Sequence, residues 1–147
     1  MPRATKMLVA VAIATAIFSA TTRADDQDVI KYRQHIMSTL NEQSAALGQI
    51  LSTSIPGDNA VAHLDALALT ASTALSAFEP KVLGGEAKPA VWANWADFSK
   101  RMNEFTQKIN EAAQTAKDKG QDAALANILD VLTCKSCHKV YREEKKE

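Results

Sequence analysis

Two cysteines and a histidine near the C-terminus have the most distinctive chemistry in this sequence. Cys134, Cys137 and His138 stand in "TCKSCHKVYREEKKE", which closes the chain, and there is no other cysteine. Two thiols three residues apart beside an imidazole can form a redox pair, part of a zinc site, a disulfide or an attachment point for haem. The rest of the sequence has to decide among these four chemistries.

Haem attachment fits the setting of these residues best. On a helix, positions i, i+3 and i+4 project from one face, so both thiols can add to the vinyl groups of a porphyrin while the imidazole reaches its iron. A redox pair would need a preceding strand in a βαβ setting, and a zinc site would need a second Cys or His pair. A disulfide across a two-residue gap would restrain the unfolded chain very little. We predict covalent haem at Cys134 and Cys137, with His138 on the iron.

The first 24 residues have the pattern of a signal peptide. Arg3 and Lys6 precede the apolar run 7–20, and Thr22-Arg23-Ala24 places small residues at a signal peptidase site. The run has about 14 residues, fewer than the roughly 20 that a membrane-spanning helix needs. We therefore expect export to the periplasm, cleavage after Ala24 and a mature domain of residues 25–147. No later segment looks long and apolar enough to span a membrane, so no membrane insertion of the mature protein is expected.

The charge balance argues against a nucleic-acid partner. The chain has 17 basic and 17 acidic residues, and residues 1–24 hold three of the basic ones and none of the acidic ones. The mature chain would therefore carry 14 positive against 17 negative charges, a net charge near −3 rather than the basic surface that nucleic acids require. The small number of glycines (five) and prolines (four) favours helices.

Apolar residues recur at helical spacing in four segments, and we find no convincing β pattern. The prolines and glycines of "IPGD", "FEPKVLGGEAKP" and "KDKG" separate these segments. The expected helices cover residues 26–54, 59–78, 91–120 and 122–147. In the last segment, the residues expected to face inward include Leu129, Val140 and Tyr141. Four amphipathic helices of this length predict an all-α fold, an antiparallel up-down-up-down four-helix bundle.

Any methionine that binds the other face of the iron must come before His138 in the chain, because no methionine follows it. By chemistry, the candidates are His35, Met37, His63 and Met102, or no protein ligand at all. Arg33 stands four residues before Met37 on an otherwise apolar stripe. A guanidinium there is costly without an anionic partner, and the haem propionates would provide one.

Three stretches carry a resemblance to a known family. "VIKYRQHIM", "GGEAKPAVWANWADF" and "CKSCHKVYR" resemble, in this order and over nearly the whole mature chain, sequences of the cytochrome c-prime family of class II c-type cytochromes. The resemblance implies a four-helix bundle, commonly a homodimer, with one haem c per chain near the C-terminus of the last helix. It also implies a pentacoordinate, high-spin iron in the periplasm that carries electrons or binds nitric oxide (NO) or carbon monoxide (CO).

The resemblance also assigns roles to residues around the haem. Cys134 and Cys137 would be the thioether anchors and His138 the axial ligand, with Arg142 beside the proximal imidazole. Carried over in the same way, Met37 would lie in the distal pocket. The haem propionate edge would be lined by Arg33, Gln34 and Glu86.

Three functions remain open from the sequence. The first is a mono-haem protein with His138 as the axial ligand, which exchanges electrons with redox partner proteins or binds NO or CO. The second is a low-spin electron-transfer cytochrome with His138 and Met37 both on the iron. The third is a haem-free helical envelope protein with a Cys134–Cys137 disulfide. No nucleophile, base and orienting group are assembled by the sequence, so we do not expect an enzyme.

Overall fold

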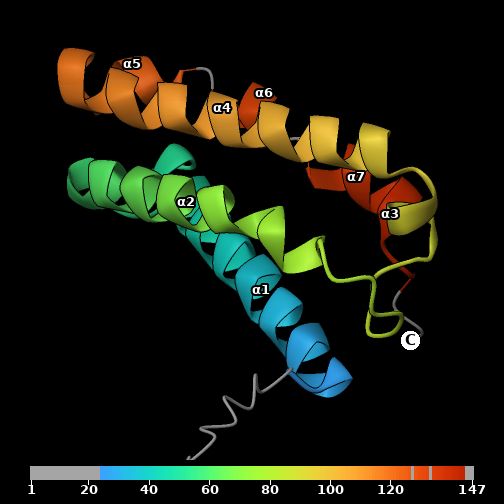
Figure 1. The fold of residues 1–147 in the computed structure, drawn as a ribbon. Helices are drawn as coiled ribbons and strands as arrows, with labels where there is room; N and C mark the ends of the chain where they lie inside the picture. Colours follow the sequence, from blue (N-terminus) through green and yellow to red (C-terminus); the bar gives the residue numbers. More distant parts are fainter. Residues whose placement is uncertain (1–23, 127, 133, 145–147) are drawn as a thin grey trace, which may run out of the picture.

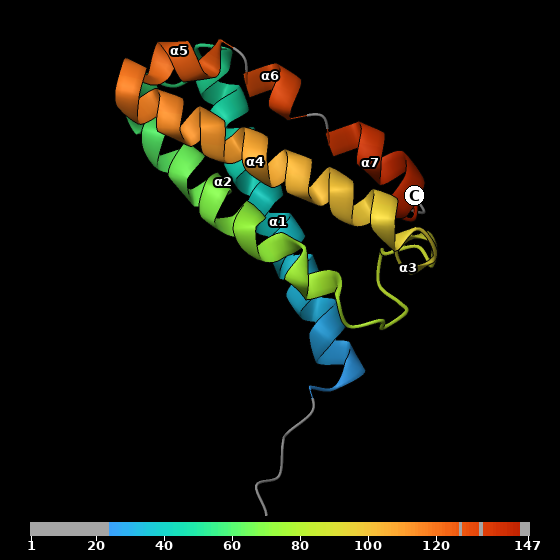
Figure 2. The same cartoon turned by 45° about the horizontal axis from the view of Figure 1, so that its top comes forward.

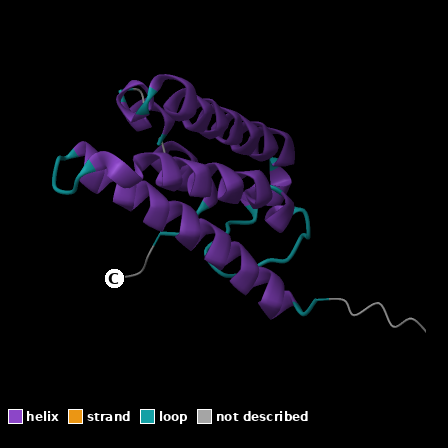
Figure 3. Cartoon of the chain, turned by 90° about the vertical axis from the view of Figure 1, so that its left-hand side faces the viewer, coloured by secondary structure: helices purple, strands orange, loops and turns teal. Residues whose placement is uncertain are grey.

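The computed structural model describes residues 24–126, 128–132 and 134–144, so the signal-peptide prediction for residues 1–24 lies outside this part except for Ala24. Within these ranges the named elements are all helical, and the remaining pairing consists of two isolated β-bridges (Figures 1 and 3). In chain order the elements are α1 (Asp26–Leu51), η1 (Gly57–Asn59), α2 (Ala60–Ala74), η2 (Ser76–Phe78), α3 (Ala90–Ala93), α4 (Trp95–Lys119), α5 (Gln121–Leu125), α6 (Ile128–Val131) and α7 (Cys134–Tyr141).

The first helix, α1, begins at a capped position. The Asp25 carboxylate accepts a hydrogen bond from the Gln27 backbone N–H at 3.3 Å, and Asp26 and Asp28 add negative charge to the first turn, where the helix dipole favours it. The helix ends at Leu51, three residues before the expected end. Its buried residues include Leu40, Leu47 and Ile50, and also Arg33.

The second helix, α2, is the central core element. Leu64 and Leu67 are fully buried, and the Thr106 hydroxyl of α4 donates to the Ala71 carbonyl at 3.1 Å. By length and composition, the segment Gly57–Phe78 is apolar enough to cross a membrane, with a mean hydropathy of 1.3, so the sequence-based expectation of no such later segment was wrong. A core helix of a soluble bundle passes the same test, and α2 packs against both α1 and α4.

The expected third helix is divided in two. Asn94 leaves the helical region at φ −119° and ψ 45°, which separates the single turn of α3 from the long helix α4. The indole N–H of Trp92 donates to the Phe78 carbonyl at 2.8 Å and so joins α3 to the end of η2. The buried residues of α4 recur at helical spacing and comprise Phe98, Met102, Ile109, Ala112, Ala113 and Ala116.

The expected fourth helix is three short helices, α5, α6 and α7. Ala124 and Ile128 are buried, as is Tyr141, whereas Leu129 is 70% exposed and Val140 is 42% exposed, so their predicted inward positions were wrong. The segment contains no glycine or proline after Gly120 that would signal the breaks. These helices are too short to be stable alone and depend on packing against α4.

The helices α1, α2 and α4 and the run from α5 to α7 nevertheless form the expected up-down-up-down four-helix bundle. Figure 2 shows α5, α6 and α7 following one another back along α4, while α1 crosses α2 on the other side. The start of α1, the start of α4 and the end of α7 therefore lie at the same end of the bundle, together with the loop that joins η2 to α3.

Candidate functional site

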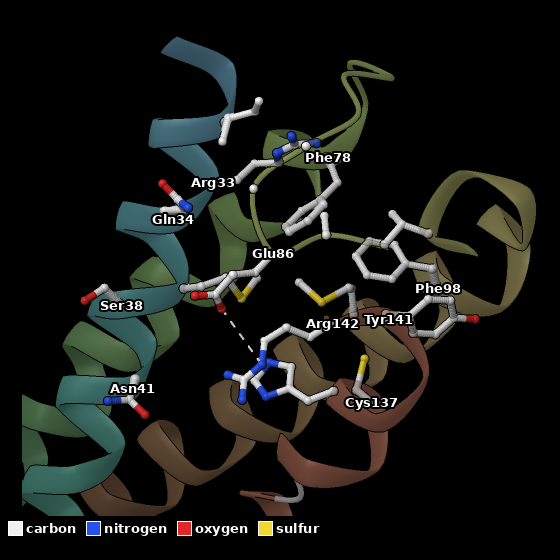
Figure 4. Close-up of a pocket in the computed structure, with 18 of the residues that line it drawn as sticks. Arg33, Gln34, Ser38, Asn41, Phe78, Glu86, Phe98, Cys137, Tyr141 and Arg142 are labelled. Atoms are coloured by element: carbon white, nitrogen blue, oxygen red, sulfur yellow. Dashed lines mark ion pairs between the residues drawn. The ribbon is translucent and has the colours of Figure 1, made fainter. Parts of the chain in front are cut away.

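A cavity of about 460 Å³ opens at this end of the bundle, between α1, the 84–87 loop, α4 and α7. Its volume is within the roughly 300–1,000 Å³ of pockets that bury small-molecule ligands and cofactors. Figure 4 shows side chains from all four segments around it. The lining includes eight residues that the sequence analysis named as candidates around the haem: Arg33, Gln34, Met37, Glu86, Met102, Cys137, His138 and Arg142.

The cysteine-histidine motif lies on α7 with its second half in the cavity wall. Cys137 and His138 are half-buried and line the cavity, while Cys134 is exposed and lies one helical turn earlier. Both thiols are free. Burial raises the pKa of the Cys137 thiol, which Arg101 partly offsets, so a neutral thiol faces the cavity.

The His138 imidazole is held in its neutral form. Partial burial lowers its pKa, and the neighbouring Arg142 guanidinium lowers it further, while Glu86 acts in the opposite direction. A neutral imidazole keeps a nitrogen lone pair, which is the form that binds a metal ion.

Arg33 is a buried cation with an incomplete set of partners. Its side chain is 3% exposed, Nη2 donates to the Val82 carbonyl at 2.8 Å, and its guanidinium lies over the rings of Trp92 (5.0 Å) and Phe78 (5.5 Å). Its Nη1 is buried with no hydrogen-bond partner, and burial lowers its pKa. Because unpaired buried donors are rare and costly, a ligand in the cavity that offers an acceptor would satisfy this atom.

The remaining α1 residues of the prediction lie on the same wall. Met37 is half-buried, and Gln34 is exposed at the cavity edge beside Gly85. Met102 reaches the cavity from α4 and is buried. His35 and His63 are not among the lining residues; His35 is exposed, and the half-buried His63 shares a hydrogen bond of 2.8 Å with Gln43.

Glu86 and Arg142 lie together on the His138 side of the cavity. Their side chains form an ion pair at 3.9 Å, drawn as the dashed line in Figure 4. The Glu143 backbone N–H donates to the Glu86 carbonyl at 2.8 Å, which fastens the loop to the end of α7. The Arg142 guanidinium acts electrostatically on the His138 imidazole, and the Glu86 carboxylate faces Arg142. The roles of Arg142 in the proximal pocket and of Glu86 at a propionate edge remain predictions.

Sequence reasoning did not assign Tyr141 to the site or connect it with Asp97. Tyr141 lines the cavity, and its hydroxyl donates to Asp97 Oδ2 of α4 at 2.6 Å; Arg101 Nε donates to the same oxygen at 2.7 Å. The pair Asp97 and Tyr141 is 44 residues apart in the chain. No local pattern signals such a contact, although the inward position of Tyr141 was predicted.

These contacts predict a pH dependence of stability. The hydrogen bond from Tyr141, followed by that from Arg101, lowers the pKa of the Asp97 carboxyl below its ordinary value of 3.8. A lowered folded-state pKa contributes stability that is fully present above the unfolded-state pKa and is lost as the pH falls through the folded-state pKa. In urea unfolding between pH 2 and 7, we expect wild type to be more stable than Asp97→Asn near neutrality and to lose this difference below pH 4. A difference that stays constant down to pH 2 would contradict the assignment.

The fold and the site together define a class of protein. A helical bundle presents Cys-x-x-Cys-His at a large cavity, and a buried guanidinium on the opposite wall lacks an anionic partner. The neutral thiol, the neutral imidazole and the unpaired Arg33 Nη1 fit a haem, which has vinyl groups, an iron and two propionates. These features are those of a c-type cytochrome.

Comparison with known proteins gives the family. The family model described as Cytochrome C' matches residues 28–142, and the chain belongs to this family. It is 28% identical over 125 residues to cytochrome c' of Alcaligenes xylosoxydans xylosoxydans, covering 83% of this chain and 98% of the relative. It is also 28% identical over 125 residues to that of Rubrivivax gelatinosus, covering 80% and 95%. The structure of ferric cytochrome c prime from Alcaligenes xylosoxidans superposes with a TM-score of 0.75 at 28% identity, covering 83% of this chain and 98% of that one.

Family membership confirms three of the sequence-based predictions. The resemblance to cytochrome c-prime is correct, the fold is the family's four-helix bundle, and the cofactor is covalently bound haem c. The protein is therefore a haem-containing c-type cytochrome, which rules against the haem-free bundle with a Cys134–Cys137 disulfide.

Proposed function

We propose that this protein is a periplasmic mono-haem cytochrome whose iron has one protein ligand, His138, and is pentacoordinate and high-spin. It serves electron transfer, the binding of NO or CO, or both. The observation that carries the proposal is the composition of the apolar part of the cavity lining. Its residues Met37, Phe78, Phe98 and Met102 contribute thioethers and rings, and His138 is the sole imidazole among the lining residues.

Each group of the site has a distinct task in this proposal. Haem supplies an iron that changes between the ferric and ferrous states and can take a small gas at an open position. The Cys134 and Cys137 sulfurs would fix the cofactor to α7, and the His138 imidazole would donate its lone pair to the metal. Arg33 Nη1 would donate to a carboxylate at the cofactor edge, with Gln34 beside it at the cavity rim.

The apolar side chains of the lining provide selectivity between gases in this proposal. Hydrogen-bond donors and steric access in a haem pocket decide whether oxygen is held. Met37, Phe98 and Met102 offer no such donor, whereas NO does not depend on one. Solved relatives support the binding of NO, because variants of cytochrome c prime from Alcaligenes xylosoxidans have been solved as nitric oxide complexes.

The low-spin alternative, with Met37 as a second ligand, is favoured by one fact: the Met37 side chain lines the cavity. Absorption spectra of the reduced protein before and after CO addition separate the two functions. We expect a five-coordinate spectrum in wild type and in Met37→Ala, with CO binding about tenfold faster in the variant because a crowding side chain is removed. Met102→Ala, which shortens the other lining methionine, is the matched control and retains the spectrum.

Two results would overturn the open-site proposal. One is a six-coordinate, low-spin spectrum of the reduced wild type before gas is added. The other is a change from low to high spin in Met37→Ala alone, which would establish Met37 as a ligand.

The proposal includes location and assembly. Residues 1–24 direct export and are removed after Ala24, so residues 25–147 form the mature protein. It works as a homodimer that exchanges electrons with redox partner proteins, without nucleic-acid partners, membrane insertion or enzymatic turnover. The family assignment and the apolar run 7–20 support this part of the proposal.

A further inference from the structure

One carboxylate oxygen on α4 is the meeting point of two hydrogen bonds. Asp97 Oδ2 accepts from the Tyr141 hydroxyl at 2.6 Å and from Arg101 Nε at 2.7 Å. The ion pair to Arg101 lies within one helix and is exposed, so it contributes little to holding the helices together. The Tyr141 bond is different, because it joins α7 to α4 and its donor belongs to a residue that is 4% exposed.

Tyr141 is also held through its ring and its backbone. The ring meets Phe98 of α4 edge-on, with centroids 5.2 Å apart. The Tyr141 carbonyl accepts from the Lys88 backbone N–H at 3.0 Å, and Ala87 and Arg142 form an isolated antiparallel bridge. The end of α7 is therefore fixed both to α4 and to the loop before α3.

The spacing along α7 connects this anchor to the haem motif. Tyr141 stands seven residues after Cys134, four after Cys137 and three after His138. Residues at these spacings share one face of a helix, so the direction of the Tyr141 side chain determines where the motif points. Figure 4 shows Cys137 and Tyr141 on the same stretch of α7, facing the cavity.

We propose that Asp97 is a positioning residue: by holding the Tyr141 hydroxyl it fixes the rotation of α7, and so the angle at which His138 and Cys137 meet the cofactor. This proposal rests on the proposed function only in taking His138 as the iron ligand. Asp97 acts through its hydrogen bond with Tyr141 and not through a hydrogen bond with the thiols or the imidazole.

The test uses the holoprotein from a host able to attach haem and compares Tyr141→Phe, Asp97→Ala and the double variant. The readouts are the electron paramagnetic resonance spectrum of the ferric haem and the reduction potential, both sensitive to the orientation of the axial imidazole. We expect each single variant to shift the g-values and the potential in the same direction. The double variant should shift them no further than Asp97→Ala does, because the Tyr141–Asp97 bond is already absent in that single variant.

Two matched controls accompany these variants. Glu104→Ala removes a carboxylate from α4 whose ion pair, to Lys100 at 3.8 Å, stays within the helix, and Tyr32→Phe removes the hydroxyl of an exposed tyrosine on α1. Both controls should keep the wild-type spectrum and potential.

Two results would overturn the positioning role of Asp97. If Tyr141→Phe and Asp97→Ala lower the free energy of unfolding but leave spectrum and potential unchanged, the contact is only structural and the proposal is wrong. Additive shifts in the double variant would also overturn it. A six-coordinate, low-spin wild type would contradict the open-site function but not this proposal, because the imidazole orientation affects both readouts in either coordination state.

Discussion

Replacing Cys134 and Cys137 together with serine is expected to give a protein without covalent haem. Serine hydroxyls do not add to the vinyl groups, so both thioether bonds are lost while the size of the two side chains is nearly kept. The expected mass is that of the polypeptide alone, and the visible absorption after denaturing separation should disappear. The loss should be complete, since the chain has no other cysteine.

Lys135→Gln is the matched control for this experiment. Lys135 lies exposed between the two cysteines on α7 and does not line the cavity, so its variant should carry one haem per chain. Covalent haem in the double serine variant would contradict the attachment site. A wild-type mass without haem and two hydrogens lighter than the dithiol would instead establish the disulfide.

Replacing Arg33 with methionine is expected to affect the holoprotein and the haem-free protein differently. With haem attached, the guanidinium would lose an anionic partner, and breaking a buried ion pair costs about 3–5 kcal/mol of unfolding free energy. In the double serine background no propionate is present, and methionine removes a buried cation with an unpaired Nη1. The change there should stay within about 1 kcal/mol, because the lost bond to the Val82 carbonyl offsets that relief.

Urea unfolding measures this difference in four proteins: wild type and the double serine variant, each with and without Arg33→Met. Lys31→Met, on the exposed face of α1, is the control in both backgrounds. The control should change stability by no more than about 0.5 kcal/mol in either background. An equal loss for Arg33→Met with and without haem would mean that the arginine supports only Val82 and the rings of Phe78 and Trp92.

The helices that could be predicted are those whose apolar stripe is long. The stripes of α1, α2 and α4 gave the correct elements because each buries one face against two neighbours. The segment after Gly120 was predicted as one helix because it lacks proline and glycine, yet α5, α6 and α7 are separate. Their boundaries follow from packing on α4, which a local pattern does not contain.

The site was predictable to the extent that its residues signal their chemistry locally. The cysteine spacing pointed to the cofactor, and Arg33 was conspicuous as a charge on an apolar stripe. The Asp97–Tyr141 contact and the Glu86–Arg142 ion pair had no such signal, because each joins residues more than 40 positions apart that only the folded chain brings together.

The two glycines of the 84–87 loop restrict how this sequence can vary over time. Gly85 has φ +65°, and a Cβ built there would lie 2.8 Å from Ile30 Cγ2; Gly84 has φ +121° with Ile30 Cδ1 at 3.0 Å. A substitution to alanine at either position would strain the backbone and push Ile30. Proteins that evolve from this chain should therefore keep both glycines even where neighbouring surface positions change. Where either glycine is replaced, a smaller residue than Ile30 should occur at position 30.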